Sequence, residues 1–186
     1  MCYPLITNEK YKFKGIKIKK EKNILFVNPI KEKGIEIVIQ PVNYFKNKIF
    51  EIVESWYPIE RKYLQILERY PNVIITPHTV DMKPIYARSK VLLVPSICHE
   101  GFGRIIIEAN INQVPVIASN VGGIKEAMGD GQVIIDDYLN INCFIDELNY
   151  LLNNYDWYKQ LKKEALKNSI RFQETNLIQI LNQFKV

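Results

Sequence analysis

The feature that most constrains the fold of this chain is a series of short, β-branched apolar runs separated by segments with helical spacing. The runs are NILFVN (23–28), KIFEIV (48–53), NVIIT (72–76), VLLVP (91–95), VPVIAS (114–119) and QVIID (132–136), and their starts lie about 18 to 25 residues apart. Helix-like segments fill most of the gaps, at 34–46, 59–70, 83–89, 103–112 and 123–128. This alternation predicts βαβ units and a parallel sheet.

The predicted strands are continuously apolar, which indicates a sheet covered on both faces. We therefore expect an α/β fold with a doubly wound parallel sheet and with ligands beyond the carboxyl ends of the strands. After residue 140 only helical spacing remains, and it predicts three C-terminal helices, within 142–155, 156–172 and 175–184. The last has an apolar stripe at Leu177, Ile178, Ile180 and Leu181, which must cover another surface.

Composition narrows the class of protein. The 186 residues, 47% of them apolar and 24% charged, suit one globular domain with a sizeable core. No apolar run approaches the roughly 20 residues that span a bilayer, and residues 1–15 lack the apolar segment of a secretory signal. The three cysteines (Cys2, Cys98 and Cys143) suit neither a disulfide framework nor a zinc site. We therefore expect a cytoplasmic protein.

The net charge of +5 arises largely from the first 33 residues, in KYKFKGIKIKKEKN (10–23) and KEK (31–33). Such a stretch attracts nucleic acid, an anionic membrane surface or a small phosphorylated ligand. The simplest alternative is a solvated, charged lead-in to the first strand. Nucleic acid is not expected as a partner, because the chain has no paired Cys/His motif and no aromatic RNA-binding signature.

The loop after the first predicted strand places two lysines where a helix begins. Pro29 ends the strand, and Lys31 and Lys33 come just before Gly34. A helix N-terminus is the positive end of the helix dipole, so lysines there are explained if an anion binds between them. Exposed lysines on a turn are the plain alternative.

The loop after the fourth predicted strand leads from one carboxylate to another. Glu100 precedes a Gly-Phe-Gly turn, and Glu108 follows it eight positions later within an apolar helix. Carboxylates together with exposed backbone amides are the groups that sugar hydroxyls need. On a helical wheel Arg104, Glu108 and Asn112 form one polar stripe. The alternative is an exposed stripe with an ordinary i,i+4 ion pair between Arg104 and Glu108.

A third glycine-containing loop, SNVGGIKEAMGDG (119–131), follows the fifth predicted strand, and all three loops are expected to converge on one edge of the sheet. The only histidines, His78 and His99, have no nucleophile or metal-ligand partner at a recognisable spacing. PSIC (95–98) also lacks the flanking glycines of a nucleophile elbow, so a hydrolase triad is not indicated.

Residues 87–128 closely resemble the C-terminal domain of retaining GT-B glycosyltransferases of family 4, the glycosyl transferases group 1 domain. The resemblance runs from about residue 22 to 165. Its signature is Glu100, then Phe102-Gly103, then Glu108 followed by a small residue, and PVIASNVGG (115–123) continues the pattern. The resemblance implies a Rossmann-like, nucleotide-sugar-binding half of the GT-B fold.

The resemblance also implies roles for particular residues. Glu100, as the catalytic carboxylate, contacts the hydroxyls of the donor sugar, Glu108 holds the ribose hydroxyls, and Lys33 neutralises the diphosphate. The donor-binding set that it implies is Asn28, Lys31, Lys33, Gly34, His78, Val80, Gly101, Phe102, Gly103, Arg104 and Glu108, with the nucleobase on the loop around His78 to Val80. No metal or other cofactor is expected, because basic side chains and amides stabilise the leaving nucleoside diphosphate.

The chain departs from the family pattern at one position near the loop after the first predicted strand. The family usually has an arginine five or six positions before the lysine, where this chain has Asn28 and Val27. Lys31 is a possible substitute, although lysine lacks the bidentate fork of arginine.

The second departure concerns domain organisation, because members of the family have two Rossmann-like domains and this chain has one. We expect a linker-like lead-in (1–22), a nucleotide-sugar-binding domain (23–168) and a helix (169–186) that packs on a missing or separate N-terminal domain. The implied function is transfer of a hexose-type sugar to an acceptor such as a lipid-linked glycan or polysaccharide precursor. A lipid-linked acceptor would bring the chain to the inner face of the membrane. A non-catalytic interaction or nucleotide-binding module is the alternative.

Overall fold

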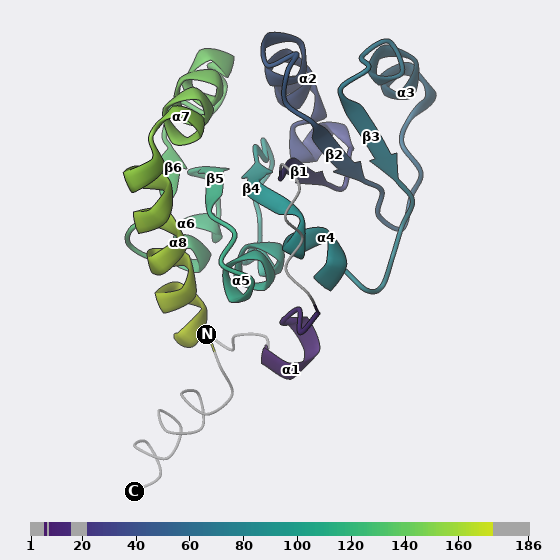
Figure 1. The fold of residues 1–186 in the computed structure, drawn as a ribbon. Coiled ribbons are helices and arrows are strands. Elements are labelled where there is room, and N and C mark those ends of the chain that lie inside the picture. The colour runs from purple at the N-terminus through teal and green to yellow at the C-terminus, as the bar shows by residue number, and fades with distance from the viewer. Residues whose placement is uncertain (1–5, 7, 16–21, 173–186) are drawn as a thin grey trace, which may run out of the picture.

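A six-stranded parallel sheet lies at the centre of the computed structural model, which describes residue 6, residues 8–15 and residues 22–172 (Figure 1). Its strands are β1 (Asn23–Val27), β2 (Phe50–Val53), β3 (Val73–Thr76), β4 (Ser89–Val94), β5 (Val116–Ser119) and β6 (Val133–Ile135). The strand order is β3-β2-β1-β4-β5-β6, so the winding reverses between β1 and β4. The predicted doubly wound parallel sheet is confirmed. In such sheets the crevice at the reversal is the usual ligand site.

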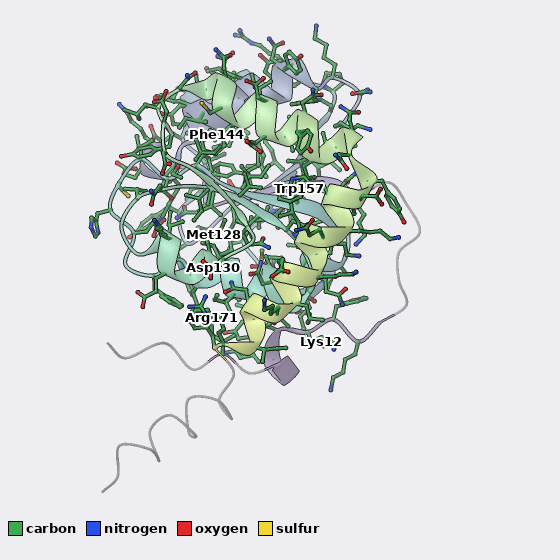
Figure 2. All side chains as sticks on the ribbon, turned by 90° about the vertical axis from the view of Figure 1, so that its left-hand side faces the viewer. Lys12, Met128, Asp130, Phe144, Trp157 and Arg171 are labelled. Atoms are coloured by element: carbon green, nitrogen blue, oxygen red, sulfur yellow. The ribbon has the colours of Figure 1, made fainter. Side chains whose placement is uncertain are left out.

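Helices cover both faces of the sheet. They are α1 (Asn8–Tyr11), α2 (Ile35–Tyr44), α3 (Arg61–Leu67), α4 (Lys83–Ala87), α5 (Arg104–Ile111), α6 (Ile124–Met128), α7 (Ile141–Asn153) and α8 (Tyr155–Ile170), with a short 3-10 turn, η1 (Lys31–Lys33). Helices α2, α3 and α7 pack on one face, and α4, α5 and α6 pack on the other. Helix α8 contacts both α7 and α5 and so connects the two layers (Figures 1 and 2).

Successive side chains of each strand point to opposite faces of the sheet, and both sets are apolar. In β1, Ile24 and Phe26 belong to the core beneath α2 and α7, whereas Leu25 belongs to the core beneath α5. Burying each such side chain contributes about 1.5–3 kcal/mol relative to exposing it. The strands of a sheet with two covered faces are therefore continuously apolar, and the strands of this sequence follow that rule.

The predicted elements are present, most of them with slightly shorter bounds, while β4 begins at Ser89, two residues before the predicted start; two of the three predicted C-terminal helices are α7 and α8. The third, with the stripe from Leu177 to Leu181, lies outside the described residues. Helix α8 continues to Ile170, and Phe172 beyond it is buried against the core on the α5 side. Near the start of the chain, Ile6 is fully buried in the same core.

One charged residue is buried within the sheet. Glu51 in β2 accepts hydrogen bonds from Arg88, Asn23 and Thr76. Burial alone would raise the pKa of Glu51, but these hydrogen bonds outweigh it, and the pKa lies below its ordinary value. This ion pair lies where α4 leads into β4, away from the loops that form the candidate site, and we assign it to stability.

Among the described residues, none of the helices combines the length and the apolar character that crossing a lipid bilayer requires.

Candidate functional site

The loops after β1 and β4 are in direct contact at the carboxyl edge of the sheet. Gly34, the residue between η1 and α2, has φ +83°, and a Cβ at this position would lie 1.9 Å from the carbonyl oxygen of Pro95. Only glycine allows both that backbone conformation and that approach. The amide of Ile97 also donates to the carbonyl of Glu32 at 3.0 Å. Lys33 is therefore held against the loop that carries Glu100.

The loop after β5 also packs on the loop that carries Glu100. A Cβ on Gly123 would lie 2.2 Å from the carbonyl oxygen of Gly101, and the Gly123 amide donates to the carbonyl of Glu100 at 2.8 Å. The three loops thus converge on one edge, as their positions after the strands predict.

A cavity of about 240 Å³ lies at this point, between the ends of β1 and β4. Its lining residues are Phe26, Val27, Asn28, Lys33, Leu93, Val94, Ser96, Glu100, Gly103, Arg104 and Ile105. Apolar strand residues thus combine with a small set of polar groups that carry both signs of charge. Concave sites of this composition are typical of small-molecule binding.

Lys33 and Glu100 form an ion pair within this cavity. The hydroxyl of Ser96 donates to the same carboxylate oxygen, Oε1, at 2.8 Å. The two charged side chains are only 27% and 15% exposed, so water screens the pair less than a surface pair. The arrangement supplies a carboxylate that accepts hydrogen bonds and a cation that attracts an anion, side by side.

Glu108, in α5, lies outside the lining but is bonded to the lining residue Arg104, and it is held from two sides. Its Oε1 accepts from Nε of Arg104 at 3.1 Å, and its Oε2 accepts from the hydroxyl of Tyr86 at 3.1 Å. Burial raises the pKa of Tyr86 well above its ordinary value, and the neighbouring Glu108 raises it further, so this hydroxyl stays protonated and donates. Hydrogen bonding to Glu108 also raises the pKa of Arg104. Arg104 reaches Tyr11 as well, at 2.7 Å from Nη2 to the hydroxyl.

The i,i+4 ion pair between Arg104 and Glu108 is present, but the alternative of an exposed stripe is wrong for Glu108. Glu108 is only 9% exposed, because α5 packs its Glu108 face against Tyr86 of α4. A helical wheel shows which residues share a face of one helix, but it does not show whether a neighbouring helix covers that face.

The structure brings some of the predicted residues together and leaves others apart. Asn28, Lys33, Glu100, Gly103 and Arg104 line the cavity. Seven predicted residues lie outside the lining: Lys31, Gly34, His78, Val80, Gly101, Phe102 and Glu108. Of these, Gly34 packs on the loop after β4, and Glu108 is bonded to the lining residue Arg104. Asn28 has φ +64°, a left-handed conformation that asparagine tolerates better than most residues.

The residues outside the lining have other contacts or are exposed. The ring of Phe102 packs edge-on against Phe172, with centroids 5.2 Å apart, which ties the Gly-Phe-Gly turn to the segment just after α8. His78 contacts Trp56, with ring centroids 4.7 Å apart, and Val80 is 91% exposed. The nucleobase position therefore stays a prediction.

Sequence reasoning missed Ser96, Tyr86 and Trp56. Ser96 lies two positions after Val94, the last residue of β4, and a polar residue at a strand's carboxyl end was a signal that could have identified it. No local signal points to Tyr86, because its contact with Glu108 joins two different helices.

Comparison with known proteins decides the family. The sequence profile described as glycosyl transferases group 1 matches residues 7–168. The chain belongs to this family. Its doubly wound sheet matches one half of the GT-B glycosyltransferase fold, as in Anabaena HepE solved with UDP-glucose. The superposition has a TM-score of 0.82 at 19% identity and covers 97% of this chain and 55% of HepE.

Curated relatives of this glycosyltransferase family member include one bacterial and one archaeal enzyme. The capsular polysaccharide biosynthesis glycosyltransferase CapM of Staphylococcus aureus is 27% identical over 133 residues, which are 67% of this chain and 35% of CapM. Trehalose synthase of Thermococcus litoralis is 30% identical over 151 residues, which are 72% of this chain and 36% of that enzyme. The chain thus spans about a third of the length of these relatives.

Proposed function

We propose that this chain binds the nucleotide-sugar donor of a retaining glycosyltransferase that transfers a hexose-type sugar from a nucleoside diphosphate to an acceptor. The observation that carries the proposal is the meeting of Lys33 and Glu100 in one cavity at the reversal point of the sheet. Family membership and the likeness to a fold solved with UDP-glucose support it.

In this proposal the ion pair opens when the donor binds. Lys33 turns to the diphosphate, whose charge exceeds that of one carboxylate, and Glu100 is released to accept hydrogen bonds from sugar hydroxyls. Ser96 already donates to Oε1 and keeps the carboxylate in place during the exchange. As the bond from the anomeric carbon to the diphosphate breaks, the cation stabilises the charge that develops on the leaving oxygen. This assigns the stabilisation to protein groups, so a metal ion is not needed.

Glu108 is proposed to hold the ribose hydroxyls through the oxygens that it shares with Arg104 and Tyr86. A carboxylate positioned by two donors loses little conformational freedom when a ligand binds, which favours a defined pose. The nucleobase is proposed to lie towards His78 and Trp56, whose rings are exposed at the carboxyl ends of the strands.

The acceptor side is proposed to come from a second Rossmann-like domain, since the solved neighbour and the curated relatives are roughly two to three times longer than the matched region. We favour a lipid-linked glycan or polysaccharide precursor as the acceptor class, because the relative CapM is named as a glycosyltransferase of capsular polysaccharide biosynthesis.

The test is calorimetric titration of the chain with UDP, GDP and ADP. We expect at least one nucleotide to bind, and Lys33→Gln and Glu108→Ala to weaken that binding about tenfold or more, because each removes a charge-assisted contact. Lys46→Gln, at an exposed lysine beyond the far end of α2, is the matched control and should bind as the parent does. Absence of binding by all three nucleotides would disprove the proposal.

A second candidate function is nucleotide binding without sugar transfer. The observation in its favour is Asn28, which lines the cavity where the family usually presents an arginine. The substitution Asn28→Arg distinguishes the two functions. Both proteins are assayed for sugar transfer and donor hydrolysis with an acceptor domain supplied. If the parent lacks these activities and Asn28→Arg has them, the non-catalytic function is correct.

A further inference from the structure

The segment of residues 8–15, which precedes β1, contacts the candidate donor site through the side chain of Tyr11. Helix α1 ends at Tyr11 and packs on α5 (Figure 1). The Tyr11 hydroxyl accepts a hydrogen bond from Nη2 of Arg104 at 2.7 Å, although the two residues lie 93 positions apart in the sequence. Arg104 lines the donor cavity, so Tyr11 lies one hydrogen bond away from that lining.

The backbone of Tyr11 is held in place at the other end of α5. The side-chain amide of Asn112, the residue directly after α5, donates to the carbonyl of Tyr11 at 2.8 Å and to the carbonyl of Glu108 at 2.9 Å. The side-chain oxygen of Asn112 accepts from the amide of Phe13 at 2.9 Å. The contacts of Tyr11 thus reach from the first residue of α5, Arg104, to the residue that follows its last turn.

The ring of Tyr11 makes a second contact with the Arg104 guanidinium. Cζ of Arg104 lies over the ring, 5.8 Å from its centroid, within the range at which an aromatic face attracts a cation. The Arg104 side chain is 55% exposed, and an exposed side chain of this length samples several rotamers unless other groups restrict it. The hydroxyl and the ring of Tyr11 together provide that restriction.

Arg104 has Glu108 as its other partner. Nε donates to Oε1 of Glu108 at 3.1 Å while Nη2 donates to Tyr11, so one guanidinium joins the two residues. Because the guanidinium is a rigid plane, fixing Nη2 on Tyr11 also fixes the direction in which Nε points. The hydrogen bond to Glu108 is the main cause that raises the pKa of Arg104, and Tyr11 raises it further, so Arg104 stays charged.

The two oxygens of Glu108 differ in how firmly their donors are held. Tyr86 donates to Oε2 and is fully buried, so the surrounding core fixes its position. Arg104 donates to Oε1 and is more than half exposed. Arg104 is therefore the less constrained of the two donors, and it is the one that Tyr11 holds.

We propose that Tyr11 is a positioning residue of the nucleotide site, which fixes through Arg104 the orientation of the Glu108 carboxylate towards the ribose hydroxyls. This inference rests on the proposed donor-binding function. It gives the segment before β1 a part in nucleotide binding, although Tyr11 itself lies outside the cavity lining. The contribution concerns the ribose, because the diphosphate is assigned to Lys33.

The test compares two ligands by calorimetric titration: the nucleoside diphosphate that the parent binds best, and its dideoxy analogue, which lacks both ribose hydroxyls. Tyr11→Phe removes the hydroxyl and keeps the ring. It should weaken binding of the nucleotide about fivefold, as the loss of one hydrogen bond to a charged group does. Binding of the dideoxy analogue should stay unchanged, whereas a merely structural role would affect both ligands alike.

Tyr63→Phe is the matched control. The Tyr63 hydroxyl donates to Oε1 of Glu36 at 2.7 Å, and Nζ of Lys62 lies over its ring, 4.4 Å from the centroid. Tyr63 thus makes the same two kinds of contact with charged groups as Tyr11, but it does so among residues that do not line the donor cavity. Urea unfolding should show a loss of stability in both variants, whereas nucleotide affinity should fall only in Tyr11→Phe.

A double-mutant cycle on nucleotide affinity tests the route through Arg104. Arg104→Met removes every donor of this side chain, so Tyr11→Phe should have no further effect in that background. The same fivefold loss with and without Arg104 would show that Tyr11 contacts the nucleotide directly, and it would overturn the positioning role. Equal losses for the nucleotide and its dideoxy analogue would overturn that role too.

The outcomes also separate this inference from the proposed function. If the parent binds none of UDP, GDP and ADP, the proposed function is disproved, and the role of Tyr11 is disproved with it. If the parent binds a nucleotide and Tyr11→Phe binds it equally well or more tightly, only the role of Tyr11 is disproved.

Discussion

Lys33 and Glu100, 67 positions apart in the sequence, form an ion pair inside the candidate donor cavity. Without a ligand each side chain compensates the charge of the other, and Ser96 binds the same oxygen of Glu100. The pair therefore has a role in the stability of the unliganded chain as well as in the proposed binding, and the two contributions are separable.

The stability contribution of this pair is measurable by a double-mutant cycle. Lys33→Gln, Glu100→Gln and the double variant should show a coupling free energy of about 1 kcal/mol, because the pair is partly buried but still reached by water. Urea unfolding of the four proteins gives this value. Strictly additive free energies of unfolding would show that the pair contributes nothing to stability.

Gly34→Ala should destabilise the fold by about 2 kcal/mol or more. The backbone at Gly34 is left-handed, and the added methyl group would meet the carbonyl oxygen of Pro95, so the loops after β1 and β4 must separate. Gly101→Ala is the control, since nothing lies within 4 Å of a Cβ there, and it should change stability by less than about 0.5 kcal/mol. Thermal or urea unfolding of both variants tests the difference, and an equal loss in both would contradict the proposed close approach.

Tyr86→Phe should cost about 2 kcal/mol of unfolding free energy, because it leaves one oxygen of the buried Glu108 carboxylate without its donor. Tyr44→Phe, at a tyrosine that is 62% exposed, removes the same atom without burial and should be nearly neutral. If Glu108 also holds the ribose, nucleotide affinity should fall in Tyr86→Phe and not in Tyr44→Phe. Calorimetric titration measures the second effect.

The free energy of unfolding should depend on pH through the protonation of Glu51. The folded-state pKa of Glu51 lies below the 4.5 expected of an unperturbed carboxyl. The contribution of its ion pair is therefore fully present above about pH 4.5 and is lost as the pH falls through the lower, folded-state pKa. Glu51→Gln should lower stability at pH 7 by about 3 kcal/mol, as removal of one partner of a buried pair does, and the difference from the parent should shrink towards pH 3.

Urea unfolding at several pH values between 7 and 3 measures this dependence. Glu68→Gln, at an exposed glutamate after α3, is the matched control and should follow the acid dependence of the parent. A constant difference between Glu51→Gln and the parent across this range would show that the ionised form of Glu51 is not what the fold requires.

The fold was predictable because its signals are local. Six apolar runs with helical segments between them predict a doubly wound sheet, since each run can bury its side chains only where helices cover both faces. The positions of Lys33 and Glu100 after strands also follow from the sequence, because parallel strands bring their carboxyl ends to one edge. The ends of most elements were predicted one to three residues too long, and the start of β4 two residues too late, since capping and turn geometry at the ends depends on neighbouring loops.

The sequence by itself determined the layered α/β architecture and the edge at which the glycine-containing loops meet. Only the tertiary structure decided that Lys33 pairs with Glu100, that Glu108 is buried against Tyr86, and that Tyr11 contacts Arg104. The physical reason is the range of the forces involved. Hydrophobic periodicity is a property of a few consecutive residues, so the sequence shows it directly. An ion pair or a hydrogen bond depends on a separation of a few ångströms between segments that the chain brings together only when it folds.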